Sequence, residues 1–169
     1  MPTRQTSSAS SSVTIPMRIE VVGAECFVPS PMARQLESWA GAAVRFLGAA
    51  GEVRAKLVGD ERMAAAHLEH CGEPGTTDVI TFDLAAGAAV TGGALDADLL
   101  VCIDEARRQS AARGIPLEHE LLLYIVHGVL HCLGHDDHDD DAAIAMHARE
   151  DEVFRALGLE PAYSAPGRG

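Results

Sequence analysis

Apolar and polar residues follow two different spacings along this chain, and each spacing predicts one kind of element. Alternation in segments such as MRIEVV is typical of half-buried strands. Helix-forming segments bounded by serine, proline or glycine predict helices. Strands are expected at 17–22, 52–59, 76–84 and 97–104, and helices at 30–47, 60–70, 104–114, 116–134 and 140–157. Strands interleaved with helices indicate an α+β fold, with a mixed sheet of about four strands packed against about five helices.

One predicted helix is much more apolar than the others. Residues 117–133 have the sequence LEHELLLYIVHGVLHCL, preceded by Pro116 and followed by Gly134. Proline favours the start of a helix and glycine favours the position just past its end. We expect this helix to lie at the centre of the fold.

Length and composition fit one domain. The chain has 169 residues, of which 47% are hydrophobic, enough for a buried core. We expect the domain at 16–160, a flexible N-terminal tail at 1–15, rich in serine and threonine, and a flexible C-terminal tail at 161–169. The first residues lack the apolar block of a secretory signal, and no run reaches the ~18 apolar residues that a membrane span needs. A cytoplasmic location without membrane contact is predicted.

Net charge limits the partners. The formal charge is -12 and the chain has a single lysine. An acidic surface repels nucleic acid and anionic membranes, so a polyanion substrate has to be met by a local basic patch or by a metal ion. The four cysteines are widely separated and form no CxxC pair, which argues against a disulfide framework or an all-cysteine zinc site. They are expected to be buried thiols.

The segment HGVLHCLGHDDH, at the end of the apolar helix, predicts a metal site. His127 and His131 are four residues apart, so both project from one face of the helix and can bind one ion. A turn after Gly134 can bring a residue from 135–138 to the same ion. Three protein ligands with one open position for water are typical of catalytic zinc. A histidine pair at this spacing also occurs by chance, but the glycine and the further His and Asp residues favour the metal site.

A zinc peptidase is disfavoured by the residue after the first histidine. In the HExxH motif of such peptidases this residue is the glutamate that acts as general base, and here it is Gly128. A metallohydrolase that acts on another substrate, such as a peptide, is therefore only an alternative.

Three segments carry a family resemblance. HGVLHCLGHDDH resembles the H-G-x-L-H-L-x-G-Y-D-H signature of the YbeY family, TTDVITFDL resembles its P-T-D-V-L-S-F-P segment, and ADLLVCIDEARRQSAARG resembles its G-D-I-V-I-S strand and following helix. Their order and spacing agree over roughly residues 17–159. The resemblance implies a zinc-dependent endoribonuclease specific for single-stranded RNA. It would act in 16S rRNA 3′-end maturation and ribosome quality control, with the ribosome or a small-subunit precursor as partner and no DNA substrate. A non-catalytic ribosome-associated factor is the other alternative.

The chain departs from the family pattern at the third metal ligand. The family's third histidine is ten residues after the first, where this chain has Asp137, and His138 follows. Both side chains can bind zinc. We predict one Zn²⁺ bound by His127, His131 and His138, because imidazole suits zinc better, and we predict no catalytic group beyond the metal-bound water. Asp136 or Asp137 could then orient a ligand imidazole, and Asp139 to Asp141 are expected to cap the last helix.

A second departure concerns phosphate binding. The family commonly has an arginine just before its P-T-D-V segment, and Cys71 is at about that place here. Phosphate contacts would have to come from other basic residues, each of which is otherwise an ordinary solvated side chain. The candidates are Arg54, Lys56, Arg107, Arg108 and Arg113.

Overall fold

A four-stranded mixed sheet forms the middle of the computed structural model, which describes residues 16–86 and 94–163. The strands are β1 (Met17–Val22), β2 (Ala50–Val58), β3 (Val79–Asp83) and β4 (Ala94–Cys102), in the order β1-β2-β4-β3. The pairs β1–β2 and β2–β4 are parallel, and β3 is antiparallel to β4. The helices are η1 (Ala24–Cys26), α1 (Ser30–Phe46), α2 (Asp60–Cys71), α3 (Ile103–Arg113), α4 (Leu117–Cys132) and α5 (Asp140–Ala156). The predicted α+β class with its mixed sheet is confirmed. The predicted tail 1–15 and residues 164–169 lie outside the described residues.

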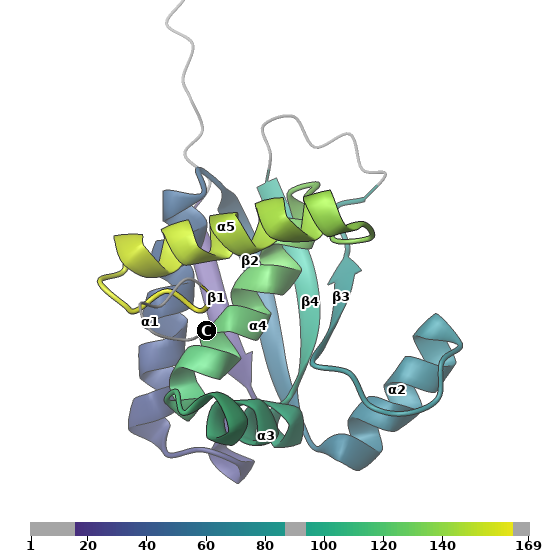
Figure 1. The fold of residues 1–169 in the computed structure, drawn as a ribbon. Helices are drawn as coiled ribbons and strands as arrows, with labels where there is room; N and C mark the ends of the chain where they lie inside the picture. Colours follow the sequence, from purple (N-terminus) through teal and green to yellow (C-terminus); the bar gives the residue numbers. More distant parts are fainter. Residues whose placement is uncertain (1–15, 87–93, 164–169) are drawn as a thin grey trace, which may run out of the picture.

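The main core lies between one face of the sheet and the helices α1 and α4. Alternate residues of β2 and β4 point into it, among them Val53, Leu99 and Val101, which have no exposed surface. Figure 1 shows α1 and α4 side by side over this face, with α5 crossing the end of α4. Most of α4 is buried from Glu120 to Leu130, as its apolar sequence predicts for a central helix.

The opposite face of the sheet carries a smaller apolar cluster under α2. Met63 and Ala66 of α2 pack there with Ile80 of β3. Elsewhere on this face apolar side chains such as Phe82 and Leu100 lie beside charged ones, and Arg54 forms ion pairs across neighbouring strands with Asp96 (2.6 Å) and Asp98 (2.5 Å). Among the described residues, no helix has both the length and the apolar character needed to cross a membrane.

Several element boundaries differ from the predicted ones for local reasons. Strand β3 begins at Val79 and not at 76. Just before it the Asp78 carboxylate accepts hydrogen bonds from Thr77 Oγ1 (3.0 Å) and from the backbone N–H of Val79 (2.8 Å), while the Asp78 carbonyl oxygen accepts from Cys102 of β4 (2.8 Å). Strand β4 begins earlier than predicted, at Ala94, where it pairs with Ala50. The first helix begins at Ser30 as predicted, and Pro29 occupies the N-cap position without a side-chain cap.

The cysteines are only partly buried. Cys102 is buried and Cys132 is half-buried, whereas Cys26 and Cys71 are exposed, and all four are free thiols. The expectation of buried thiols is therefore wrong for Cys26, which lies in the short helix η1, and for Cys71, the last residue of α2.

Candidate metal centre

His127 and His131 meet at the C-terminal end of α4. They lie one helical turn apart, and their Nε2 atoms are 3.0 Å from each other. Two atoms bound to one zinc ion at about 2.1 Å and a tetrahedral angle would lie about 3.4 Å apart. The two imidazoles are therefore already oriented toward a common point.

The loop after α4 brings a carboxylate to the same point. Gly134 has a φ of +89°, a conformation that favours glycine, and the backbone N–H of His135 donates to the carbonyl oxygen of Leu130. The chain reverses there, and the Asp137 carboxylate oxygens lie 3.6 Å from His127 Nε2 and 3.7 Å from His131 Nε2. His127, His131 and Asp137 form the group of potential metal ligands in which all donor atoms are within 4.8 Å of one another.

The predicted third ligand, His138, is not part of this close group. Its Nδ1 is hydrogen-bonded to Asp136 Oδ1 and its side chain is 83% exposed. It belongs to a second possible group, with Asp136 and Asp137, that contains neither histidine of α4. The backbone N–H of Asp137 also donates to Asp136 Oδ1, so this short turn fixes the loop. Which of the two residues binds the metal stays a prediction.

Both helix histidines are held in the tautomer that a metal ligand needs. His127 Nδ1 lies 2.8 Å from Glu150 Oε1, and His131 Nδ1 lies 3.1 Å from the carbonyl oxygen of His135. Because both partners are acceptors, each Nδ1–H can donate, which leaves the Nε2 atom of each ring to bind a metal ion. The two Nε2 atoms face each other at 3.0 Å, a separation at which they can share a proton or, with a small adjustment, one metal ion. The donor set therefore fits a metal ion.

Glu150 is the most buried charged group of the site. It lies on α5 with no exposed surface, and its Oε2 has no hydrogen-bond partner among the described residues. Burial alone would lower the pKa of His127, but the hydrogen bond and the charge of Glu150 outweigh it, and with Asp78 and Asp137 they raise that pKa. Glu150 thus fixes the orientation of the His127 ring and strengthens its electron donation.

Gly128 explains why this centre differs from that of a zinc peptidase. A Cβ atom at Gly128 would lie 2.8 Å from Leu99 Cδ2 and 2.9 Å from Thr81 Oγ1, both in the sheet. The position after the first histidine therefore faces the contact between α4 and the sheet, and a glutamate side chain has no room there.

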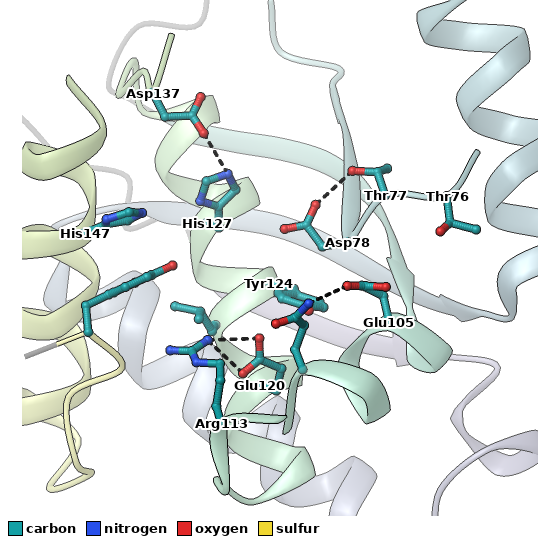
Figure 2. A pocket seen from close by; sticks show the side chains of 13 residues that line it. Thr76, Thr77, Asp78, Glu105, Arg113, Glu120, Tyr124, His127, Asp137 and His147 are labelled. Atoms are coloured by element: carbon teal, nitrogen blue, oxygen red, sulfur yellow. Dashed lines mark hydrogen bonds and ion pairs between the residues drawn. The ribbon is translucent and has the colours of Figure 1, made fainter. Parts of the chain in front are cut away.

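Two hollows adjoin the three-residue group. One, of about 530 Å³, is called here the carboxylate hollow, because Asp78, Glu105, Glu120 and Asp137 are among its lining residues. Figure 2 shows it, with the ion pair between His127 and Asp137 drawn at its upper end.

The second hollow, of about 610 Å³, is called here the histidine hollow, because His67, His127, His131 and His138 are among its lining residues. The two hollows share residues 77 and 78 of the segment before β3, together with His127 and Asp137. A substrate that lies across the metal centre can therefore extend into both.

Basic residues are scarce at both hollows. Arg54 and Lys56 lie at the opposite face of the sheet, in a different hollow. Arg107 pairs with Asp104 (3.1 Å), and Arg108 pairs with Asp60 (2.7 Å). Of the predicted phosphate-binding candidates, only Arg113 lines the carboxylate hollow, where it pairs with Glu120 at 3.1 Å. The histidine hollow contains Cys71 at the place of the family's arginine.

The sequence of the chain matches a known family over this whole region. The family model described as Endoribonuclease YbeY matches residues 30–158, which include every residue of the three-residue group. The chain belongs to the YbeY endoribonuclease family. Curated relatives named Endoribonuclease YbeY include a protein of Azoarcus sp. (34% identical, covering 80% of this chain and 54% of the relative) and one of Aromatoleum aromaticum (31% identical, covering 94% and 97%).

A solved structure also resembles this one. The solution structure of TM1509 from Thermotoga maritima matches with a TM-score of 0.53 at 21% identity, covering 89% of this chain and 99% of that one. This likeness supports the fold alone. The YbeY family assignment rests on the sequence matches.

Sequence reasoning missed Glu150 and Asp78. Glu150 lies on the stripe of α5 that also carries the buried residues Met146, Val153 and Phe154. A carboxylate at a core position of an amphipathic helix is a signal of a specific partner, so the spacing contained the information. Asp78 could be placed near the site only once the sheet order brought the start of β3 beside α4.

Proposed function

We propose that the chain is a zinc-dependent endoribonuclease that hydrolyses single-stranded RNA, acting in the cytoplasm on 16S rRNA 3′ ends and in ribosome quality control. The observation that carries this proposal is the convergence of His127, His131 and Asp137 at one point in a chain of the YbeY family. The curated relatives carry the name endoribonuclease, which supports an RNA substrate, and the ribosomal role is what the family resemblance implies.

His127 and His131 would hold the metal, with a third ligand from the loop after α4. The separations of 3.6 and 3.7 Å favour Asp137 over the predicted His138 for this third place. A bound zinc ion would lower the pKa of a water molecule toward ~7 and offset charge on the phosphoryl oxygens. Glu150 and the carbonyl oxygen of His135 keep both imidazoles in the required tautomer.

Asp78 adds a carboxylate beside the proposed metal centre. It lines both hollows, and its charge acts on His127. Its Oδ1 accepts the hydrogen bonds from Thr77 and Val79, which leaves Oδ2 as the oxygen that can accept a hydrogen bond from a substrate.

Single-stranded RNA suits the arrangement of the two hollows. A flexible strand can place one phosphate at the metal centre and its neighbouring nucleotides in the hollows, whereas a duplex is too stiff to do so. Because free basic side chains are scarce at the site, the metal ion would carry most of the phosphate recognition.

Zinc content and RNA cleavage test this proposal together. Purified protein should contain about one zinc per chain, lose cleavage of single-stranded RNA after chelation and regain it with zinc, while duplex RNA and casein remain intact. His131→Ala should lose both metal and cleavage. Casein hydrolysis without RNA cleavage would instead support the metallohydrolase of another substrate class.

The third ligand is tested by a matched pair of variants. Asp137→Ala should lose zinc and His138→Ala should retain it, because only Asp137 lies near both histidines of α4. The opposite result would assign the place to His138, and retention in both variants would exclude each of them as an essential ligand.

A non-catalytic ribosome-associated factor is the second candidate function. The charge of -12 and the pairing of Arg54, Arg107 and Arg108 with carboxylates favour it, because they leave few cations for an RNA backbone. Expression of His131→Ala in cells that lack the wild-type copy separates the two. Normal rRNA processing in those cells would support the non-catalytic factor and contradict the enzyme.

A further inference from the structure

The carboxylate hollow follows α4 away from the metal centre. Glu120, Tyr124 and His127 line it from successive turns of this helix, a span of about 10 Å at 1.5 Å per residue. His131 and Cys132 line the histidine hollow at the other end of the helix. An RNA strand whose phosphate lies at His127 would therefore place one neighbouring nucleotide in each hollow.

The lining of the carboxylate hollow does not suit a phosphate group. Its one arginine, Arg113, is bound to Glu120 and donates to the carbonyl oxygen of Ala162 at 2.5 Å. Asp78 Oδ2 has no hydrogen-bond partner among the described residues. Glu105 Oε2 is paired with Arg108 at 2.7 Å, and Glu105 Oε1 accepts from Gln109 Nε2 at 2.8 Å and keeps a second lone pair. Acceptors at this density favour a ligand edge that carries N–H donors and disfavour an anion.

An aromatic pair forms another part of the wall. The rings of His147 on α5 and Tyr163 are stacked, with centroids 3.8 Å apart and planes at 15°. In Figure 2, His147 lies on the side of the hollow opposite to Thr76, Thr77 and Asp78. Aromatic rings of this kind are the usual contact surface for an unstacked base in single-stranded RNA.

We propose that the carboxylate hollow is a base-binding subsite that prefers a base with an exocyclic amino group, such as cytosine or adenine, over uracil. The inference rests on the proposed function and adds a substrate preference to it. The amino group of cytosine donates to a carboxylate oxygen, whereas uracil presents a carbonyl oxygen at the same place and meets Asp78 or Glu105 acceptor to acceptor.

The test compares two single-stranded oligoribonucleotides of equal length, one of cytidine and one of uridine, with the zinc-loaded protein. We expect kcat/KM to be about tenfold higher for the cytidine strand, the effect of one hydrogen bond to a charged acceptor. Glu105→Gln should reduce this ratio toward one, because the amide offers a donor to the uracil carbonyl oxygen as well as an acceptor to the cytosine amino group. Glu61→Gln makes the same charge change at an exposed position on α2, outside both hollows, and should keep the ratio.

A second variant, at the aromatic wall of the hollow, tests base stacking separately from the carboxylate contact. His147→Ala should weaken binding of both strands equally, measured by fluorescence anisotropy, because stacking does not distinguish the bases. Equal cleavage of the two strands by the wild type, or equal losses on both strands in Glu105→Gln, would overturn the inference.

Failure of the proposed function gives a different result. If neither strand is cleaved, the endoribonuclease proposal fails, and anisotropy with the wild type and Glu105→Gln decides the base preference alone. Tighter binding of the cytidine strand that is lost in Glu105→Gln would support the subsite. Equal binding of both strands, or binding of a divalent cation that Glu105→Gln abolishes, would refute it.

Discussion

Replacing Gly128 by alanine tests whether α4 is held against the sheet as closely as the structure indicates. The new Cβ would lie 2.8 Å from Leu99 Cδ2 and 2.9 Å from Thr81 Oγ1. Carbon atoms in contact are normally about 3.5–4.0 Å apart, so the helix or the two strands have to move by several tenths of an ångström.

Two opposing effects set the magnitude. Alanine favours a helix over glycine by about 1 kcal/mol, and overpacking a core costs about 1–3 kcal/mol. Because the Leu99 and Thr81 side chains stand on central β4 and its neighbour β3, little room for relaxation exists and the overpacking term dominates. We expect Gly128→Ala to lower the free energy of unfolding by about 1–2 kcal/mol, which corresponds to a fall in Tm of roughly 2–8 °C for a chain of this size.

Gly41→Ala is the matched control. Gly41 is also a buried glycine inside a helix, but its Cβ would lie 3.4 Å from the end of the flexible Arg45 side chain and 4.0 Å from Ile19 Cγ1, which are ordinary contacts. Here the helix preference should dominate, and Tm should stay the same or rise. Thermal unfolding followed by circular dichroism, in chelator so that metal binding does not contribute, measures both variants. A Gly128→Ala protein as stable as the Gly41→Ala protein would refute the close contact between α4 and the sheet.

Three further predictions concern the metal centre and its surroundings. Glu150→Gln should weaken zinc binding about 10–100-fold, because it removes the charge that orients His127. Glu152→Gln, at an exposed position of the same helix, should bind zinc like the wild type, and competition with a chromophoric chelator measures the affinity of both variants. Cys71→Arg should lower the KM for single-stranded RNA about tenfold at low salt, because it adds a cation to the histidine hollow. Cys26→Arg, also at an exposed cysteine but outside both hollows, should leave the KM unchanged, and an unchanged KM for Cys71→Arg would contradict the placement of position 71 beside the substrate. Zinc at 100 times its Kd should stabilise the wild type by about 2.7 kcal/mol in urea unfolding, and Asp137→Ala should lose most of this gain.

The elements of the fold could be predicted because their signals are local. Pro116 and Gly134 mark the ends of α4, and the αL conformation of Gly114 ends α3 as expected. Asp139 caps α5 by accepting a hydrogen bond from the backbone N–H of Ala142 at 2.8 Å, also as expected. The start of β3 was predicted three residues too early, because the hydrogen bonds that the Asp78 carboxylate accepts from Thr77 and Val79 depend on one rotamer and leave no signal in the apolar pattern.

The candidate site was predictable only where one helix carries it. His127 and His131 are adjacent by helical geometry alone, so their spacing was sufficient. The third ligand depends on the orientation of a loop side chain, which the sequence does not reveal. The preference of zinc for imidazole favours His138, whereas the loop geometry brings Asp137 close to His127 and His131. Glu150 comes from another helix, and only the packing of α5 against α4 reveals its contact with His127.

The position of His127 is set by contacts on two sides of α4. On one side Gly128 lets the helix approach β3 and β4, and on another side Glu150 of α5 holds the imidazole itself. Asp78 precedes β3 directly, so the distance between the helix and the sheet also sets the distance between His127 and this carboxylate. We therefore expect Gly128→Ala to reduce RNA cleavage even at temperatures at which the variant is still folded. A shift of a few tenths of an ångström changes the alignment of His127 with Asp78, while most of the core stays intact.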